Sequence, residues 1–158
     1  MMTRQQEMQR IIRRYKDETG NKEINMGEIA DYAIRLGWPL PKPTNPRDRL
    51  AKDFSDAARE ETRIDGRTGR PYRANHAITE WRQGELFTTW IDIDEAPRPR
   101  MLKSLVRRRE QMVGDAWHLT LDQDHWNGIN PNDEPINLPL DFGPDVDWRK
   151  NSPEEGAA

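Results

Sequence analysis

The sequence contains no cysteine among its 158 residues, which excludes a disulfide framework, a thiol nucleophile and any zinc site built on thiolates. It also has no apolar run near the 18 residues that a membrane-spanning helix needs. No apolar segment follows the charges at the N-terminus, as a secretory signal would require. We therefore expect a cytoplasmic protein with no membrane contact.

Catalytic motifs are equally scarce, because the sequence has no glycine-rich phosphate loop, nucleophile elbow or paired acid and base. One alternative is a Mg²⁺ site of the nuclease kind at Asp92, Asp94 and Glu95, since hard cations prefer oxygen ligands. No lysine or histidine stands at a defined distance from these acids. We interpret them as acids at the edge of a loop, and we expect no catalytic residue and no cofactor.

A second alternative is a metal site on a helix. His118, Asp122 and His125 lie at spacings of four and three residues, which places them on one helical face, and Asp124 is adjacent. The spacing is common in polar helix ends, and Trp117 lies beside this cluster. We therefore expect no metal site here.

The formal net charge of −3 conceals two halves of opposite sign. Residues 1–110 hold 23 Lys and Arg against 18 Asp and Glu, whereas residues 111–158 hold 2 against 10. Arginine, whose fork suits phosphates and guanine edges, supplies 19 of the 25 basic residues. A basic body followed by an acidic tail is typical of proteins that bind DNA, although such asymmetry also arises in other proteins.

Two helices are predicted at the start of the chain. Apolar residues at helical spacing, including Ile11 and Tyr15, predict a helix over residues 3–18. Asn25 has the character of an N-cap for a second helix, which Gly37 would end. The proline-rich residues 38–43 then require an extended connection.

A third helix has the strongest start signal in the chain. Asn45 is the expected N-cap, and Pro46 occupies the first helical position, which tolerates the missing N–H. The helix should run to about Thr62, with Leu50, Phe54, Ala57 and Ala58 on its buried face.

A β-hairpin is predicted after this helix. Residues 62–64 and 71–73 favour strands, and the turn signals Asp65-Gly66 and Thr68-Gly69 lie between them. Residues 85–93 are rich in β-branched and aromatic side chains and predict a further strand. His76 is expected to be packed or hydrogen-bonded.

A long helix over about residues 100–124 follows, and its apolar stripe can either cover the core or pair with the same helix of a second subunit. From Asn127 onward the chain has five of its 12 prolines and many acids, which predicts a poorly ordered tail unless something docks it. The expected domains are residues 1–96, 97–126 and 127–158.

The order of three helices and a hairpin resembles the winged helix-turn-helix superfamily of DNA-binding proteins. Gly27–Trp38 corresponds to the supporting helix, Asn45–Thr62 to the recognition helix and Ile64–Ile78 to the wing. The resemblance implies an α+β fold, a winged helix followed by a long C-terminal helix and an extended acidic tail. It also implies that the third helix enters the major groove of double-stranded DNA while the wing contacts the backbone or the minor groove.

The predicted DNA contacts are basic residues of the third helix and the wing. The hairpin is the more persuasive part, because four arginines and one acid lie between Arg63 and Arg73. The third helix is mixed in charge, so its basic residues can instead form ion pairs within a solvated face. The expected contacts are Arg49, Lys52, Arg59, Arg63, Arg67, Arg70 and Arg73.

A second partner is suggested by the tail. The apolar residues Leu138, Leu140 and Phe142 follow the amide of Asn137, in a spacing similar to the short motif that docks replication and repair proteins into the sliding clamp. That motif usually begins with glutamine. The same alternation also suits a strand packed onto the domain.

Three functional hypotheses follow from these patterns. The first is a non-enzymatic winged-helix protein that binds double-stranded DNA as a homodimer and acts as a regulator or accessory factor. The second is a protein-interaction adaptor in replication, repair or a mobile-element system. The third is a metal-dependent nuclease that uses Asp92 and Asp94.

Overall fold

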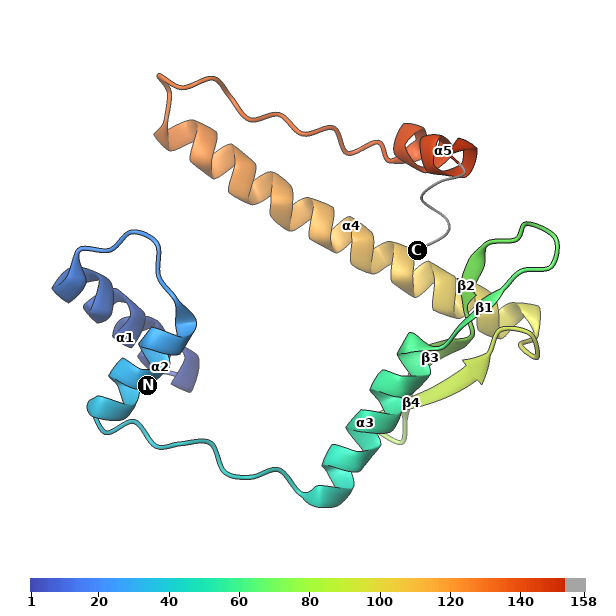
Figure 1. The fold of residues 1–158 in the computed structure, drawn as a ribbon, viewed down its shortest axis with the longest axis horizontal. Coiled ribbons are helices and arrows are strands. Elements are labelled where there is room, and N and C mark those ends of the chain that lie inside the picture. The colour runs from blue at the N-terminus through green and yellow to red at the C-terminus, as the bar shows by residue number, and fades with distance from the viewer. Residues whose placement is uncertain (153–158) are drawn as a thin grey trace. The chain divides into compact units, whose positions relative to one another are not determined.

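The computed structural model describes residues 1–152 and contains helices and antiparallel strands, so the protein is of the α+β class (Figure 1). The chain divides into two compact units, Met1–Asp48 and Arg49–Ala158. The predicted domain boundaries at residues 96 and 126 both fall inside the second unit and stay predictions. Residues 153–158, the end of the predicted tail, lie outside the described residues.

Within residues 1–152 the structure has five helices and four strands. In chain order they are α1 (Arg4–Thr19), α2 (Met26–Arg35), α3 (Pro46–Glu60), β1 (Thr62–Ile64), β2 (Pro71–Arg73), β3 (Asn75–Arg82), β4 (Glu85–Asp92), α4 (Arg98–Ile129) and α5 (Gly143–Asn151).

Side-chain caps define the two helices of the first unit. The Thr3 hydroxyl accepts from the backbone N–H of Gln6, and the Gln6 side chain accepts from the backbone N–H of Thr3, which forms a reciprocal capping box. Gly20 ends α1 in the left-handed conformation with φ 71°. Asn25 caps α2, as predicted.

The core of the first unit is an aromatic pair. Tyr15 of α1 and Tyr32 of α2 meet edge to face with ring centroids 5.4 Å apart, and Ile29 packs with them. The Tyr15 hydroxyl donates to Glu28 at 2.9 Å, and the Tyr32 hydroxyl donates to Glu18 at 2.8 Å. Each phenol thus buries its ring and satisfies its polar end on the other helix.

Helix α3 begins as predicted, because the Asn45 side chain accepts from the backbone N–H of Arg47 at 2.9 Å. The prediction that Leu50, Phe54, Ala57 and Ala58 form a buried face of α3 is wrong. Leu50 is 57% exposed and Phe54 is 69% exposed, and no residue of α3 is buried. This helix therefore forms from its N-cap and its helix propensity, although nothing in residues 1–152 buries its apolar side.

Two separate hairpins follow α3, where the sequence predicted one hairpin and a further strand. β1 pairs with β2, and β3 pairs with β4. The predicted wing, Ile64–Ile78, is therefore too long, because its last four residues belong to β3. A two-residue turn with positive φ at both Gln83 and Gly84 closes the second hairpin, and its short Gln-Gly signal is easily missed.

The core of the second unit lies where α4 crosses β3. Ile78 is 2% exposed, and Ala74, just before the strand, is fully buried. Glu80 of β3 accepts hydrogen bonds from Arg100 and from Lys103 of α4, the latter at 3.1 Å. A buried apolar side chain and a clustered ion pair therefore hold the helix to the strand.

The segment after α4 returns along the helix (Figure 1). The Asn127 side chain donates to the carbonyl of Ile136 at 2.7 Å and accepts from its N–H at 2.9 Å, and Gln123 accepts from the N–H of Leu138 at 2.8 Å. The tail is thus docked by α4 itself. It ends in α5, which the sequence analysis did not predict, although Gly143-Pro144 is a helix start signal.

None of the helices in residues 1–152 is both long enough and apolar enough to cross a membrane.

We expect Ile78→Ala to lower the free energy of unfolding by about 2–4 kcal/mol, because it removes a buried side chain and leaves a cavity. Urea denaturation followed by tryptophan fluorescence would measure the change. Leu86→Ala is the matched control at a 59% exposed position of the paired strand, where the effect should stay within about 0.5 kcal/mol. Equal losses in the two variants would contradict the placement of the core on β3.

Candidate nucleic-acid interface

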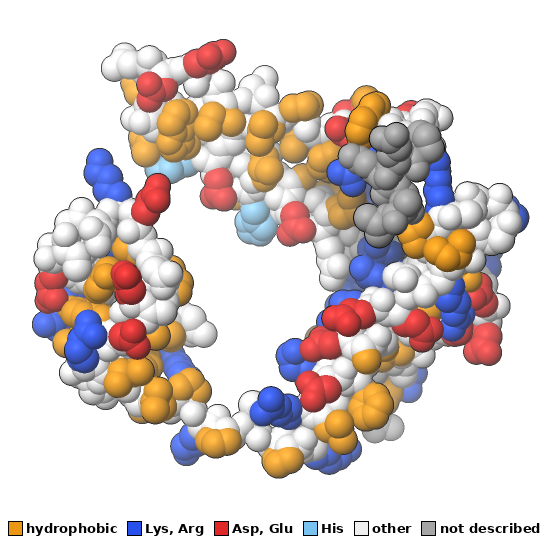
Figure 2. Space-filling view, viewed as in Figure 1, with side chains coloured by type: hydrophobic (Ala, Val, Ile, Leu, Met, Phe, Trp, Pro, Cys, Tyr) orange, Lys and Arg blue, Asp and Glu red, His pale blue; other side chains and the backbone are white. Residues whose placement is uncertain are grey.

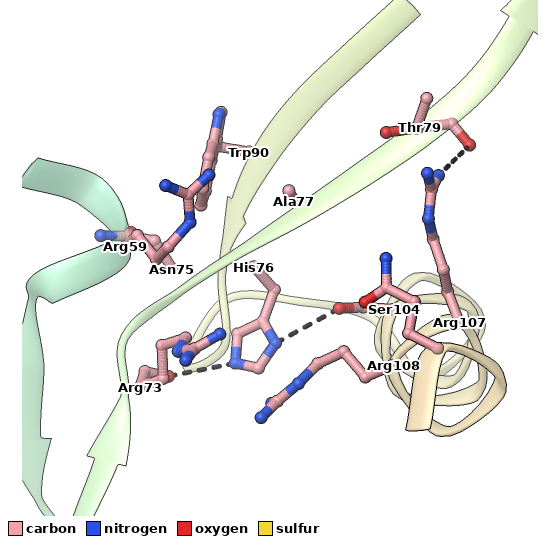
Figure 3. Close-up of a pocket in the computed structure, with 11 residues that line it drawn as sticks. Arg59, Arg73, Asn75, His76, Ala77, Thr79, Trp90, Ser104, Arg107 and Arg108 are labelled. Atoms are coloured by element: carbon pink, nitrogen blue, oxygen red, sulfur yellow. Dashed lines mark hydrogen bonds between the residues drawn. The ribbon is translucent and has the colours of Figure 1, made fainter. Parts of the chain in front are cut away.

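A cavity of about 210 Å³ lies within the second unit, between the end of α3, the second hairpin and α4 (Figure 3). Four arginines line it and no aspartate or glutamate does. We call it the arginine pocket. Its lining residues are Arg59, Arg73, Asn75, His76, Ala77, Thr79, Trp90, Ser104, Arg107, Arg108 and Gln111.

His76 and Ser104 form the buried floor of the arginine pocket, being 5% and 3% exposed. The His76 Nε2 lies 3.1 Å from the carbonyl oxygen of Arg73, and Nδ1 lies 3.3 Å from the Ser104 hydroxyl. A carbonyl can only accept, so Nε2 carries the proton, and in the neutral ring Nδ1 accepts from Ser104. As predicted, His76 is a packed and hydrogen-bonded residue.

This pair of hydrogen bonds joins the end of β2 to the first half of α4. Figure 3 shows Arg73 approaching the imidazole from the strand side and Arg108 approaching it from α4. In residues 1–152, neither Arg73 nor Arg108 forms an ion pair. Both guanidinium groups therefore border the same pocket, and no carboxylate in residues 1–152 pairs with either.

The other two arginines of the pocket are partly engaged. Arg107 donates to the carbonyl of Thr79 at 3.4 Å. The Arg59 guanidinium lies 5.7 Å from the ring centroid of Trp90 and donates to Asp56 at 3.0 Å. Each of these contacts leaves further N–H donors of the guanidinium unused, since arginine has five.

Of the predicted DNA contacts, Arg59 and Arg73 lie in the arginine pocket and the others do not. Lys52 pairs with Asp56 at 2.6 Å on α3, so this helix has the ion-paired surface that the sequence left as an alternative. The Arg67 side chain is 87% exposed at the tip of the first hairpin. Arg70 donates to the carbonyl of Lys150 at the end of α5, and Arg49 is exposed on α3.

Arg63 is committed to carboxylates. Its guanidinium donates to Asp92 at 2.7 and 2.8 Å, to Asp94 at 2.7 Å and to Glu61 at 3.2 Å, so it joins the first hairpin to the end of the second. This cluster leaves little of the arginine for a phosphate, and DNA contact by Arg63 stays a prediction. We assign it a structural role.

The same cluster bears on the nuclease alternative. Hydrogen bonding to Arg63 lowers the pKa of Asp92 below its usual range, and the backbone N–H of Asp94 acts in the same direction. Asp94 in turn accepts from the Tyr72 hydroxyl at 2.9 Å, which raises the pKa of that phenol. The two carboxylates are thus held by a cation and a phenol of their own chain.

Within the part of the chain that the structure describes, no group of three or more histidine, aspartate or glutamate side chains is placed to hold a metal ion. His118 and Asp122 of α4 border a shallow hollow beneath the tail, together with Trp126.

The predicted clamp-binding residues of the tail lie along α4. Leu138, Leu140 and Phe142 border a hollow whose other wall includes Met112 and Leu119. They are 52%, 43% and 45% exposed, so each is partly covered by the helix. This arrangement agrees with the alternative in which the apolar residues pack onto the domain itself. Docking of these residues to a sliding clamp stays a prediction.

The arginine pocket also contains residues that sequence reasoning missed. Arg107 and Arg108 belong to the run Arg107-Arg108-Arg109, whose charge is plain in the sequence. Nothing in the sequence places that run beside Arg73, which lies more than thirty residues away. Trp90 and Ser104 carried no signal at all.

Comparison with known proteins adds no relative: the chain matches no family model, no curated protein sequence and no solved structure.

The ion pair between Arg63 and Asp92 predicts an acid-dependent loss of stability. The pKa of Asp92 is lower in the folded chain than its unfolded value of about 3.9. The stabilisation is therefore complete above that value and disappears as the pH falls through the lower folded pKa. We expect Asp92→Asn to lower the melting temperature at pH 7, and we expect the gap to the parent protein to narrow below about pH 4.

Glu95→Gln is the matched control, because no ion pair involves Glu95 in residues 1–152. Thermal unfolding followed by circular dichroism across the pH range measures both variants. A gap for Asp92→Asn that stays constant into acid would show that the ion pair contributes nothing to stability.

Proposed function

We propose that this protein binds double-stranded DNA through its phosphate backbone, with the arginine pocket as the main contact. The observation that carries the proposal is a concave surface lined by four arginines and no carboxylate. In a chain whose formal net charge is −3, such a surface attracts an anion locally despite the overall charge.

The proposed contacts follow from the geometry of guanidinium groups. Arg73 and Arg108 can each donate two parallel N–H bonds to phosphate oxygens, because neither is occupied by a carboxylate. The buried pair His76 and Ser104 holds the strand and the helix that carry them, so little freedom has to be lost on binding. Arg107 extends the same surface along α4.

The first hairpin is proposed as a second contact. Arg67 projects from a tip whose backbone is ordered by Asp65, which accepts from the N–H of Arg67 at 2.8 Å. Asp65 also donates its own N–H to the carbonyl of Arg70 at 2.9 Å. A tight and exposed tip with one outward arginine suits contact with a phosphate next to a groove.

The winged-helix interpretation belongs to this proposal. The order of helices and first hairpin along the chain supports it, with α3 as recognition helix and β1–β2 as wing. Lys52 and Arg59 both bind Asp56, which neutralises much of the α3 surface. We therefore propose backbone binding with little reading of base sequence, in an accessory factor or a regulator that is not an enzyme.

The test is binding of a random-sequence duplex by fluorescence anisotropy at salt concentrations from about 50 to about 200 mM. Combined replacement Arg73→Ala, Arg107→Ala and Arg108→Ala should weaken binding at least tenfold at low salt. It should also reduce the slope of log affinity against log salt by roughly 2–3, because each lost phosphate contact removes nearly one unit.

A charge-matched control removes three basic residues from exposed positions of α1, namely Arg10→Ala, Arg13→Ala and Lys16→Ala. This variant should keep the salt slope of the parent protein. An unchanged slope in the pocket variant would place the contact elsewhere. Absence of duplex binding by the parent protein at low salt would favour the adaptor hypothesis instead.

A further inference from the structure

Helix α4 carries a row of exposed apolar side chains that line neither the arginine pocket nor the hollows beneath the tail in residues 49–152. Successive members are four, seven, four and four residues apart, which keeps them on one side of the helix. Their exposure ranges from 44% to 59%. On the face seen in Figure 2, hydrophobic side chains gather along α4 and the segment beside it. We call this row the α4 stripe: Leu102, Val106, Val113, Trp117 and Leu121.

The other sides of α4 are occupied by the protein's own chain. Ser104, Arg107 and Gln111 face the second hairpin and line the arginine pocket. Met112, Ala116 and Leu119 face the tail. At about 100° per residue, the tail-facing side and the pocket-facing side each lie roughly 120–130° from the α4 stripe, in opposite directions around the helix. The stripe is thus the apolar side of α4 that faces neither the second hairpin nor the tail in residues 49–152.

The charge of α4 changes sign along its length. Residues 98–110 hold six basic residues and one acid, whereas residues 111–129 hold three acids and no lysine or arginine. Of the six basic residues, Arg100 and Lys103 pair with Glu80 and two line the arginine pocket, which leaves Arg98 and Arg109 for contact with a second copy. Two copies lying parallel would bring like charges together, and two copies lying antiparallel bring the basic half of one against the acidic half of the other. The charge pattern therefore favours a second copy of this helix in the antiparallel orientation.

The α4 stripe is also nearly the same when read in either direction. Leu102 and Leu121 are equally distant from a point between residues 111 and 112, and so are Val106 and Trp117. An antiparallel pair related by a two-fold axis at that point would place Trp117 of each copy against Val106 of the other. The same axis would place the exposed Arg98 opposite His125, one residue from Asp124. A self-complementary surface of this kind is what a closed dimer needs.

We propose that this protein forms a homodimer in which the two α4 helices pack antiparallel through the α4 stripe. The proposal goes beyond DNA binding and does not depend on it. Because the arginine pocket lies on a different side of the helix, roughly 130° away, the dimer contact does not include the α4 residues that line it. Trp117 is the expected anchor, since large aromatic side chains dominate the energy of such interfaces.

The first experiment measures self-association by sedimentation equilibrium over a wide range of protein concentration. Trp117→Ala should raise the dimer dissociation constant at least tenfold. Trp148→Ala is the matched control, because Trp148 on α5 is also 59% exposed, and it should leave the constant unchanged. Circular dichroism confirms that both variants are folded. A parent protein that stays monomeric at every concentration, or equal effects of the two variants, overturns the proposal.

The second experiment tests the direction of the helices and uses the absence of native cysteine. A short bis-maleimide reagent should link Val113→Cys to its own copy, because that position lies near the two-fold axis. Leu102→Cys and Leu121→Cys should each fail alone, since two equal positions would lie roughly 28 Å apart along the axis. A mixture of these two variants should cross-link. Linkage of Leu102→Cys to its own copy would mean parallel helices and would overturn the proposal.

Discussion

The arrangement of the second unit depends on the buried contact between β3 and α4. Ile78 supplies the apolar part of this contact, and the hydrogen bonds from His76 to Ser104 and to the carbonyl of Arg73 supply its polar part. Because both ring nitrogens are satisfied, the histidine can be buried without an unpaired polar atom. The same contact sets the end of β2 beside the first half of α4. For this reason Arg73 and Arg108, which are distant in the sequence, line the same pocket.

Arginine has two different uses in this protein, and the surrounding carboxylates separate them. Arg63 binds Asp92, Asp94 and Glu61 and so acts as a cross-link between two hairpins. In the arginine pocket, Arg59 pairs with Asp56, whereas Arg73 and Arg108 form no ion pair in residues 1–152. The number of arginines alone therefore overstates the positive charge that is available to an outside anion. The effective surface is smaller than the basic composition suggests, and it is concentrated in one cavity.

Helix α4 serves three neighbours on three sides. Its first half packs on β3, its second half holds the returning tail through Asn127 and Gln123, and its remaining apolar side carries the proposed dimer contact. Such a division explains why apolar residues lie all around this helix, which a single buried face would not require. The composition of the acidic tail predicts a loosely ordered segment. The tail packs along α4 nevertheless, because amide side chains of this helix form hydrogen bonds with its backbone.

The sequence by itself determined the local structure. Capping residues, prolines and glycines set the starts and ends of α1, α2 and α3, and the turn signals after Arg63 set the first hairpin, because these preferences act over a few residues. It also singled out Arg59 and Arg73, which line the arginine pocket. Only the tertiary structure decided which arginines pair with carboxylates, since Arg63 binds Asp92 and Arg73 lines a pocket with Arg108 across long stretches of chain. The burial of apolar helix faces could not be predicted from the sequence either. A period of about 3.6 residues shows that α3 and α4 have apolar sides, but whether such a side is buried depends on which distant segment packs against it.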